Sequence, residues 1–400
     1  MMVATFGSSM ALIVPMAFSL ALRVDELAPG REEVLGYLIG IGSVVSLLAN
    51  PLVGTVSDRT RSRFGRRRPY LLAGSLVGTV GTAVMAWSAT VPILGLGWVL
   101  TTVGWGTALG AISNVQADRL PRSQRGRVSG LTGVTTQTAP VLGVLLAGAV
   151  SSNQVLLFAL PCVAGTALVL PYLLGVRETD SRGPAPADRL TVGRLLRSYG
   201  FDPRAHRDFA WNWLGRFLFF LGLSMTTTFA TFFYAQRLDV DIPGVAGFLA
   251  VTAACGVLTA LAGGLGGGFL SDRLGRRRVF VFLAGGVFAS GAVVSAFADS
   301  YVLLLTGSLL ASLSIAAFAA VDQAIVLDVL PHRDTQAGRY MAVVGFSQKI
   351  PSAVGPLVAP LVISLNASSE GGNYTLLYLT AGALGLVGAT LIALRVRSVR

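Results

Sequence analysis

The chain has 400 residues, of which 53% are hydrophobic and 12% are charged, and its mean hydropathy is +0.69. A soluble protein of this length does not need so much apolar surface to form a core, so the expected solvent is a lipid bilayer. The net charge of +12 is also typical of nucleic-acid-binding proteins, but the basic residues stand in short loops between apolar runs. Cys162 and Cys255 both fall inside apolar runs, which argues against a disulfide framework or a thiolate metal cluster. We expect no metal site and no cofactor.

Twelve apolar runs are long enough to cross a membrane, which takes about 20 residues. They cover residues 1–22, 34–56, 70–89, 91–117, 128–150, 155–176, 209–234, 245–270, 279–298, 301–327, 340–365 and 374–394. A cleaved signal peptide is the alternative interpretation of the first run. No basic residue precedes that run and Pro15 interrupts it, so we favour a spanning helix that is clipped or whose start site is placed too late.

The basic residues occur mainly in alternate connections between the runs. The opposite connections hold only Arg23, Arg31 and Arg237. Because Lys and Arg favour the cytoplasmic side of a membrane, this distribution predicts that both termini are cytoplasmic. It also explains the net charge without a nucleic-acid partner. We therefore expect a multi-pass protein of the cell inner (plasma) membrane, present as a monomer.

An internal repeat relates the two halves of the chain. A loop that reads Gly-Thr-Val-Ser-Asp-Arg and then Gly-Arg-Arg-Arg recurs as Gly-Phe-Leu-Ser-Asp-Arg and then Gly-Arg-Arg-Arg, and two shorter matches follow at a nearly constant offset. The matched pairs are 54–59 with 268–273, 65–68 with 275–278, 118–121 with 328–331 and 137–140 with 348–351. Six runs per copy give both halves the same orientation. The repeat predicts an all-α membrane protein of twelve transmembrane helices in two parallel six-helix bundles, at 1–176 and 208–400, joined by a cytoplasmic linker at 177–207.

The repeated loop resembles the signature of the major facilitator superfamily, and the resemblance covers essentially the whole chain. Within that superfamily, the string Ser-Asp-Arg at 57–59 followed by Ser-Arg-Phe-Gly-Arg-Arg-Arg-Pro at 62–69 is similar to that of glycoside-pentoside-hexuronide:cation symporters and sucrose transporters. The resemblance implies alternating access at a site between the two halves. The cation-coupling acids of melibiose-type members have no counterpart here, because the second run offers only Asn50 and the fourth has no acid before Asp118. We therefore do not expect sodium coupling at that place.

The repeated loop is a candidate gating motif. Anchoring to anionic headgroups explains its arginines in part. Headgroup anchoring requires neither glycines nor an acid among the arginines, whereas glycine permits a left-handed turn and an aspartate forms charge-assisted hydrogen bonds. In the resembling proteins this loop closes the cytoplasmic side. The candidate gating residues are Gly54, Asp58, Arg59, Gly65, Arg66, Arg67, Arg68, Gly268, Asp272, Arg273, Gly275 and Arg276. Asp118 and Asp328 are either members of this network or solvated interfacial charges.

Ionisable groups within the apolar runs are candidates for the substrate or proton pathway, because a charge in hydrocarbon is costly unless it is paired or hydrated. Asp322 is the acid that lies well inside a run, with Arg216 at a similar depth and Lys349, the chain's one lysine, deeper still. The full set of candidates is Asp322, Gln323, Lys349, Arg216, Gln137, Gln348 and Asn114.

Structural roles are the alternatives for several of these residues. Arg216 is placed so that it can extend to an interface marked by Trp211 and Trp213. Lys349 is placed to form a structural ion pair with Asp322. The glutamines are equally suited to hydrogen bonding between helices.

The expected function is secondary active transport by alternating access, with proton-coupled uptake of a sugar, glycoside or related small solute as the leading hypothesis. Proton-driven efflux of a drug or metabolite is the alternative, and a non-transporting membrane sensor is a third. The sequence shows no paired catalytic acids, nucleophile elbow or nucleotide-binding loop, so we do not expect an enzyme. The expected partners are the bilayer, a small-molecule substrate and a coupling proton.

Overall fold

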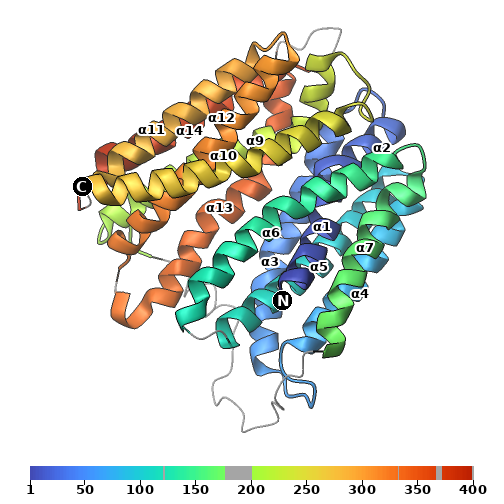
Figure 1. Cartoon of the computed structure of the whole chain (residues 1–400), viewed down its shortest axis with the longest axis horizontal. Helices are drawn as coiled ribbons and strands as arrows, with labels where there is room; N and C mark the ends of the chain where they lie inside the picture. The colour runs from blue at the N-terminus through green and yellow to red at the C-terminus, as the bar shows by residue number, and fades with distance from the viewer. Residues whose placement is uncertain (120–121, 176–200, 332, 366–371, 399–400) are drawn as a thin grey trace. The chain divides into compact units, whose positions relative to one another are not determined.

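A computed structural model of the chain describes residues 1–119, 122–175, 201–331, 333–365 and 372–398 (Figure 1). In these ranges all regular structure is helical, and the long helices number twelve. The first is continuous from Met2 to Leu27, with a π-helical turn, η1 (Pro15–Ser19), between α1 (Met2–Val14) and α2 (Leu20–Leu27). The all-helical fold predicted from the sequence is confirmed.

The remaining helices follow in chain order. They are α3 (Glu33–Arg59), α4 (Arg68–Ala86), α5 (Val91–Arg119), α6 (Arg122–Ala149), α7 (Gln154–Gly175), α9 (Arg207–Leu238), α10 (Val245–Leu274), α11 (Arg277–Ala296), α12 (Tyr301–Val329), α13 (Arg333–Ile363) and α14 (Tyr374–Arg395).

Ten helices in the described part of the chain are long and apolar enough to span a membrane. Several extend past the apolar runs. The 32 residues of α9, for example, measure about 48 Å at 1.5 Å per residue, whereas the hydrocarbon core is about 30 Å thick. The other two helices, α6 and α13, are more polar: the apolar described part of α6 is Thr138–Ala149, and α13 carries Lys349.

The chain divides into two compact units, Met1–Ala187 with Ala230–Ala254 and Asp188–Phe229 with Cys255–Arg400. This division follows the sequence repeat except at 230–254, which the repeat places in the second half. Within the first unit, Thr231 Oγ1 donates a hydrogen bond to the Ala17 carbonyl of η1 (2.6 Å). The domain boundaries at 176 and 208 remain a prediction.

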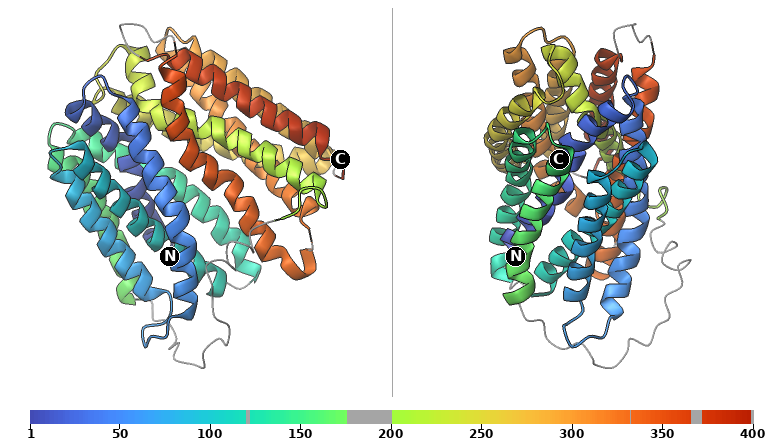
Figure 2. Two further views of the ribbon diagram at one scale, coloured as in Figure 1. Left: turned by 180° about the vertical axis from the view of Figure 1, so that it is seen from behind. Right: turned by 90° about the vertical axis from the view of Figure 1, so that its right-hand side faces the viewer.

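Small residues bring neighbouring helices into close contact inside each unit. In the first unit, α4 lies beside α5 and α7 (Figure 2), and a Cβ at Gly104 of α5 would collide with the backbone of Gly78 in α4. In the second unit, a Cβ at Gly215 of α9 would collide with the Gly388 carbonyl of α14. Such contacts let van der Waals packing hold helices together where lipid removes the hydrophobic driving force.

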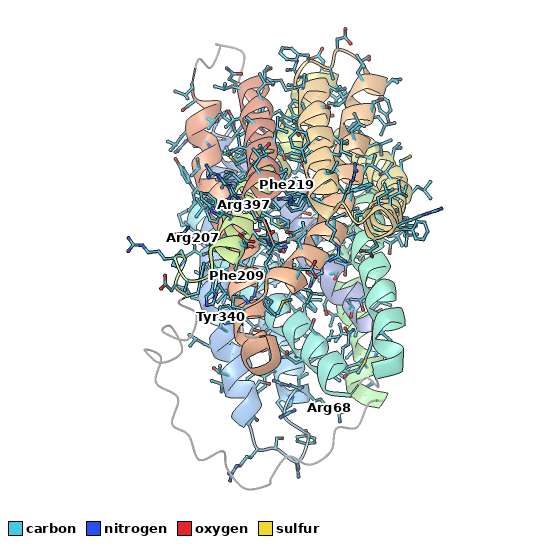
Figure 3. All side chains as sticks on the ribbon, turned by 90° about the vertical axis from the view of Figure 1, so that its left-hand side faces the viewer. Arg68, Arg207, Phe209, Phe219, Tyr340 and Arg397 are labelled. Carbon is cyan, nitrogen blue, oxygen red and sulfur yellow. The ribbon has the colours of Figure 1, made fainter. Side chains whose placement is uncertain are left out.

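Aromatic side chains form the centre of the second unit. The rings of Phe219 (α9) and Phe318 (α12) are stacked with centroids 3.8 Å apart, and Phe288 of α11 packs against Phe219 at 5.1 Å. Near the start of α9, Phe209 meets Tyr340 of α13 edge to face at 5.5 Å (Figure 3). These contacts fix α9 against α12 and α13 on both sides of Arg216.

Candidate functional site

The second glycine of each loop copy has the left-handed conformation that the sequence predicted for a turn. Gly65 has φ +84° and Gly275 has φ +61°, a region in which residues with a Cβ are strained. The first glycine of each copy is helical instead. A Cβ at Gly54 would meet nothing within 4 Å, and one at Gly268 would make an ordinary 3.7 Å contact with Ala320. Close backbone approach therefore does not explain Gly54 or Gly268.

In the first copy, the hydrogen bonds of Arg67 and Ser57 fasten the end of α3 to the start of α4. Arg67 Nη1 donates to Ser57 Oγ (3.1 Å), and Ser57 Oγ donates to the Arg66 carbonyl (3.1 Å). Arg67 is buried although it is a loop arginine. Asp58 and Arg59 lie at the end of α3, and their side chains are outside the described part of the structure. Their gating role remains a prediction.

In the second copy, Arg277 forms ion pairs with two aspartates, Asp272 and Asp328. Its guanidinium forms ion pairs with Asp272 at the end of α10 (2.9 Å) and with Asp328 at the end of α12. Arg273 and Arg276, the arginines singled out in the sequence, are exposed. Arg277 was missed, but it is the repeat equivalent of Arg67, and that correspondence is the signal that identifies it.

The last arginine of each loop copy binds the end of the last helix of its own half. Arg68 Nη2 donates to the Leu173 carbonyl near the end of α7 (Figure 3), and Arg278 Nη1 donates to the Val396 carbonyl just after α14 (2.9 Å). Carbonyls at a helix C-terminus lack intrahelical donors and carry the negative end of the helix dipole, so both contacts are favourable. These two arginines therefore have a structural role that the sequence did not predict.

An ion pair is buried in the second unit between Arg216 of α9 and Asp322 of α12. Asp322 is 1% exposed and Arg216 is 7% exposed. The pair lies about 10 Å, or two helical turns, before the end of α12. Arg216 Nε donates to Ser347 Oγ of α13 (2.9 Å), and the guanidinium carbon lies 5.5 Å from the centre of the Phe220 ring. Arg216 is thus the point at which α9, α12 and α13 meet.

The carboxylate of Asp322 is only partly satisfied. One oxygen, Oδ2, faces Arg216, whereas the buried Oδ1 has no hydrogen-bond partner among the residues that the structure describes. Ser347 is fully buried, and its hydroxyl donates to the Val344 carbonyl (2.6 Å), so its lone pairs are directed to Arg216. Ser347 was not recognised in the sequence because a serine inside a helix carries no distinctive pattern.

The structure gives Asp322 a different partner from the one that the sequence suggested. Lys349 does not pair with Asp322: it is exposed on α13, and no ion pair involves it in the described part of the chain. Arg216 does not extend to the interface either, because burial and the ion pair hold it inside the unit. Instead, Trp213 Nε1 donates to the Val343 carbonyl of α13 (2.9 Å), one turn before Ser347.

The other polar candidates are dispersed. Gln323 of α12 and Gln348 of α13 are exposed, and Asn114 of α5 is half-buried. Gln137 lies on α6, with its side chain outside the described part. Asn50 of α3 packs beside α5, where a Cβ at Gly106 would lie 3.4 Å from Asn50 Oδ1. Among the described residues no group of three or more His, Cys, Asp and Glu side chains is arranged to hold a metal ion.

Comparisons with known proteins agree with this architecture. The sequence matches the family model of the Major Facilitator Superfamily over residues 1–267 and 243–400. The general alpha-glucoside permease of Schizosaccharomyces pombe is 34% identical over 84 residues, which are 21% of this chain and only 14% of that permease. The class C tetracycline resistance protein of Escherichia coli is 27% identical over 384 residues, covering 88% of this chain and 85% of that protein.

A solved structure with the same fold is a mutant form of the nucleoside transporter NupG. It superimposes with a TM-score of 0.79 over 98% of this chain and 97% of that chain, at 12% identity. At this identity the similarity shows the fold alone.

Proposed function

Because the chain belongs to the major facilitator superfamily and is therefore a secondary transporter of a small-molecule substrate, we propose that it couples transport to a proton through the Arg216–Asp322 pair. The observation that carries this proposal is the burial of Asp322 against a single cation, with one carboxylate oxygen unpaired. Ionisable groups inside a membrane protein are costly and typically mark ion or substrate pathways.

Protonation of Asp322 changes the net charge of the buried Arg216–Asp322 pair. The guanidinium of Arg216 stays charged, so protonation of Asp322 leaves a buried cation whose one remaining polar contact among the described residues is the hydroxyl of Ser347. Losing one partner of a buried ion pair costs about 3–5 kcal/mol. An imbalance of this size shifts a two-state equilibrium on the order of a hundredfold or more.

The helix most directly linked to this change is α13. Among the residues described, three side-chain hydrogen bonds join it to α9: Trp213 Nε1 to the Val343 carbonyl, Arg216 Nε to Ser347 Oγ, and Ser224 Oγ to the Pro351 carbonyl (2.8 Å). Pro351 lacks a backbone N–H, so the Ser347 carbonyl has no intrahelical donor and α13 is weakened at this level. We propose that opening of the ion pair bends or shifts α13 at this point.

We further propose that the direction is uptake and that the cargo is a sugar, glycoside or related small solute. The support is the resemblance of the loop string to glycoside and sucrose symporters, together with the local match to the alpha-glucoside permease. The candidate gating residues of the first loop copy, Asp58 and Arg59, are proposed to close the cytoplasmic side.

Counterflow and gradient-driven uptake in proteoliposomes test this function. Purified full-length protein is offered labelled glycosides, organic acids and drugs, first in exchange without a gradient and then with an inward proton gradient. We expect exchange for at least one solute and accumulation that a protonophore abolishes. Accumulation that persists with the protonophore would contradict proton coupling.

Efflux is the second candidate, and the tetracycline resistance relative favours it because that match covers most of both proteins. The direction of flux separates the two functions. With the protein uniformly oriented in vesicles, an uptake symporter moves solute and proton the same way, whereas an antiporter moves them oppositely. Solute leaving the vesicle lumen as protons enter would support efflux over uptake.

A further inference from the structure

Lys349 lies inside the apolar run 340–365, which the sequence predicts to cross the membrane, and it is on α13 in the structure. It stands nine residues after the start of that run, so about 14 Å of helix separate it from the nearer end of the apolar segment. Its side chain is exposed and makes no ion pair with any residue that the structure describes. A lysine near a helix end reaches the interface by extending its side chain, but the depth of Lys349 exceeds that reach.

The face of α13 that carries Lys349 is unlike a lipid-facing surface. Gln348 and Ser352 are exposed beside Lys349, and a Cβ at Gly345, one turn earlier, would meet nothing within 4 Å. By contrast, the exposed face of α10 is formed by large apolar side chains. These are Val251, Leu258, Leu261, Leu265 and Phe269.

The cost of placing an ammonium in hydrocarbon, several kcal/mol, favours water beside Lys349 rather than lipid. Gln348 and Ser352, the exposed polar residues beside Lys349, also favour water over lipid at this place. An aqueous path through the membrane beside Lys349 would meet this requirement.

The chain offers no acid to neutralise Lys349 at this depth. Asp322 is the one acid well inside an apolar run of the sequence, and it is occupied by Arg216 on the buried side of the unit. The remaining acids lie in connections or near the ends of the apolar runs. A charged ammonium with water access but no protein counter-charge attracts an anion.

We infer that Lys349 binds an anionic group of the transported solute, so that the cargo is a small organic anion carrying a carboxylate or a comparable charge. This inference rests on the proposed transport function and specifies its substrate class. Gln348, exposed next to Lys349, is placed to add a neutral hydrogen bond to the same solute.

Water access at position 349 is tested without any substrate. In full-length protein with Cys162 and Cys255 replaced by serine, Lys349→Cys is exposed to a membrane-impermeant methanethiosulfonate reagent. We expect labelling, because the reagent reacts only with thiols in water. The control is Leu258→Cys, which is equally central in α10 and 69% exposed but apolar, and which should stay unlabelled. An unlabelled cysteine at 349 would overturn the inference.

Charge selectivity is tested by counterflow, which needs no proton gradient and is therefore independent of proton coupling. The probes are matched pairs: glucose with glucuronate, and a methyl glucoside with the corresponding glucuronide. We expect the wild type to prefer the anion of at least one pair. Lys349→Gln should weaken competition by that anion at least about tenfold relative to its neutral partner, as expected for a lost charged contact, whereas Lys349→Arg retains the preference. An unchanged anion-to-neutral ratio in Lys349→Gln would overturn the inference.

Discussion

At Ser347, a buried hydroxyl uses both of its hydrogen-bonding directions. It donates to the Val344 carbonyl of its own helix and accepts from Arg216 Nε of α9. The hydroxyl cannot turn away from the arginine without breaking its own bond to the helix. Ser347 is therefore a positioning residue, which holds Arg216 toward Asp322 and connects the ion pair to α13.

Removing this hydroxyl should weaken transport. Ser347→Ala leaves Arg216 Nε without its acceptor, and the loss of a hydrogen bond to a charged group costs about 1.5–3 kcal/mol. We predict that gradient-driven uptake falls at least about tenfold, whereas Ser347→Thr, which keeps the hydroxyl, retains activity. The matched control is Ser290→Ala, because Ser290 is exposed on α11 and its hydroxyl, among the residues described, bonds only to the Gly286 carbonyl of its own helix.

A double-mutant comparison of Ser347→Ala with and without Asp322→Asn tests whether Ser347 has a purely structural role. If Ser347 acts through the ion pair, Ser347→Ala should have little further effect on exchange once Asp322→Asn is present, because residues in one network are not additive. An equal loss in both backgrounds would show that Ser347 serves packing alone.

The sequence predicted the importance of Asp322, Arg216 and Lys349 from their charge and depth, but it did not predict which of them pair. Depth along a helix follows from counting residues, and it already placed Arg216 and Asp322 at similar levels. The neighbour toward which each side chain points depends on how α9, α12 and α13 pack. No local sequence pattern encodes that packing. The sequence therefore left Lys349 as one possible partner of Asp322, whereas packing pairs Asp322 with Arg216.

At the scale of elements, the two loop copies share a backbone turn but differ in the contacts of their arginines. The turn at Gly65 and Gly275 follows directly from the sequence, because both copies place glycine before the arginine run. In the first copy Arg67 is bound to Ser57, whereas in the second the equivalent Arg277 bridges two acids. The repeat thus predicts which residues correspond, while the neighbouring helices determine what each contacts.

Neutralising Arg277 should slow transport more than neutralising an exposed arginine outside the two loop copies. Arg277→Gln separates the ends of α10, α11 and α12, but its ion pairs are partly exposed, so each contributes at most about 1 kcal/mol. We predict a turnover about two- to fivefold lower with little change in apparent affinity. The control is Arg397→Gln, which removes an exposed arginine outside both loop copies and should stay close to the wild type. In the first copy we predict the same pattern for Asp58→Asn. Unchanged turnover in both Arg277→Gln and Asp58→Asn would argue against a gating role of the loops.

At the scale of the whole molecule, the sequence predicted twelve helices and their repeat because hydropathy and arginine placement are distributed over long segments. It predicted the ends less well, since α9 and α12 continue beyond the apolar runs into polar residues such as Arg237 and Asp328. It also could not predict that residues 230–254 belong to the first compact unit, because tertiary packing decides this.

The orientation of the chain in the membrane is a prediction of the arginine distribution. Single cysteines at positions 68 and 278 should be labelled from the cytoplasmic side, and a cysteine at position 237 from the opposite side. Impermeant thiol labelling of intact cells and of inverted vesicles, in a background without Cys162 and Cys255, measures this. Labelling of positions 237 and 278 from the same side would refute the topology.

We propose that Asp322 carries the coupling proton, and comparing accumulation with exchange for Asp322→Asn in proteoliposomes tests this role directly. The control is Asp299→Asn, which removes an exposed carboxylate between α11 and α12. We predict that Asp322→Asn abolishes accumulation driven by a proton gradient but keeps counterflow of bound substrate, and that the control keeps both. Accumulation against a gradient by Asp322→Asn would contradict the claim and leave the carboxylate as a structural partner of Arg216.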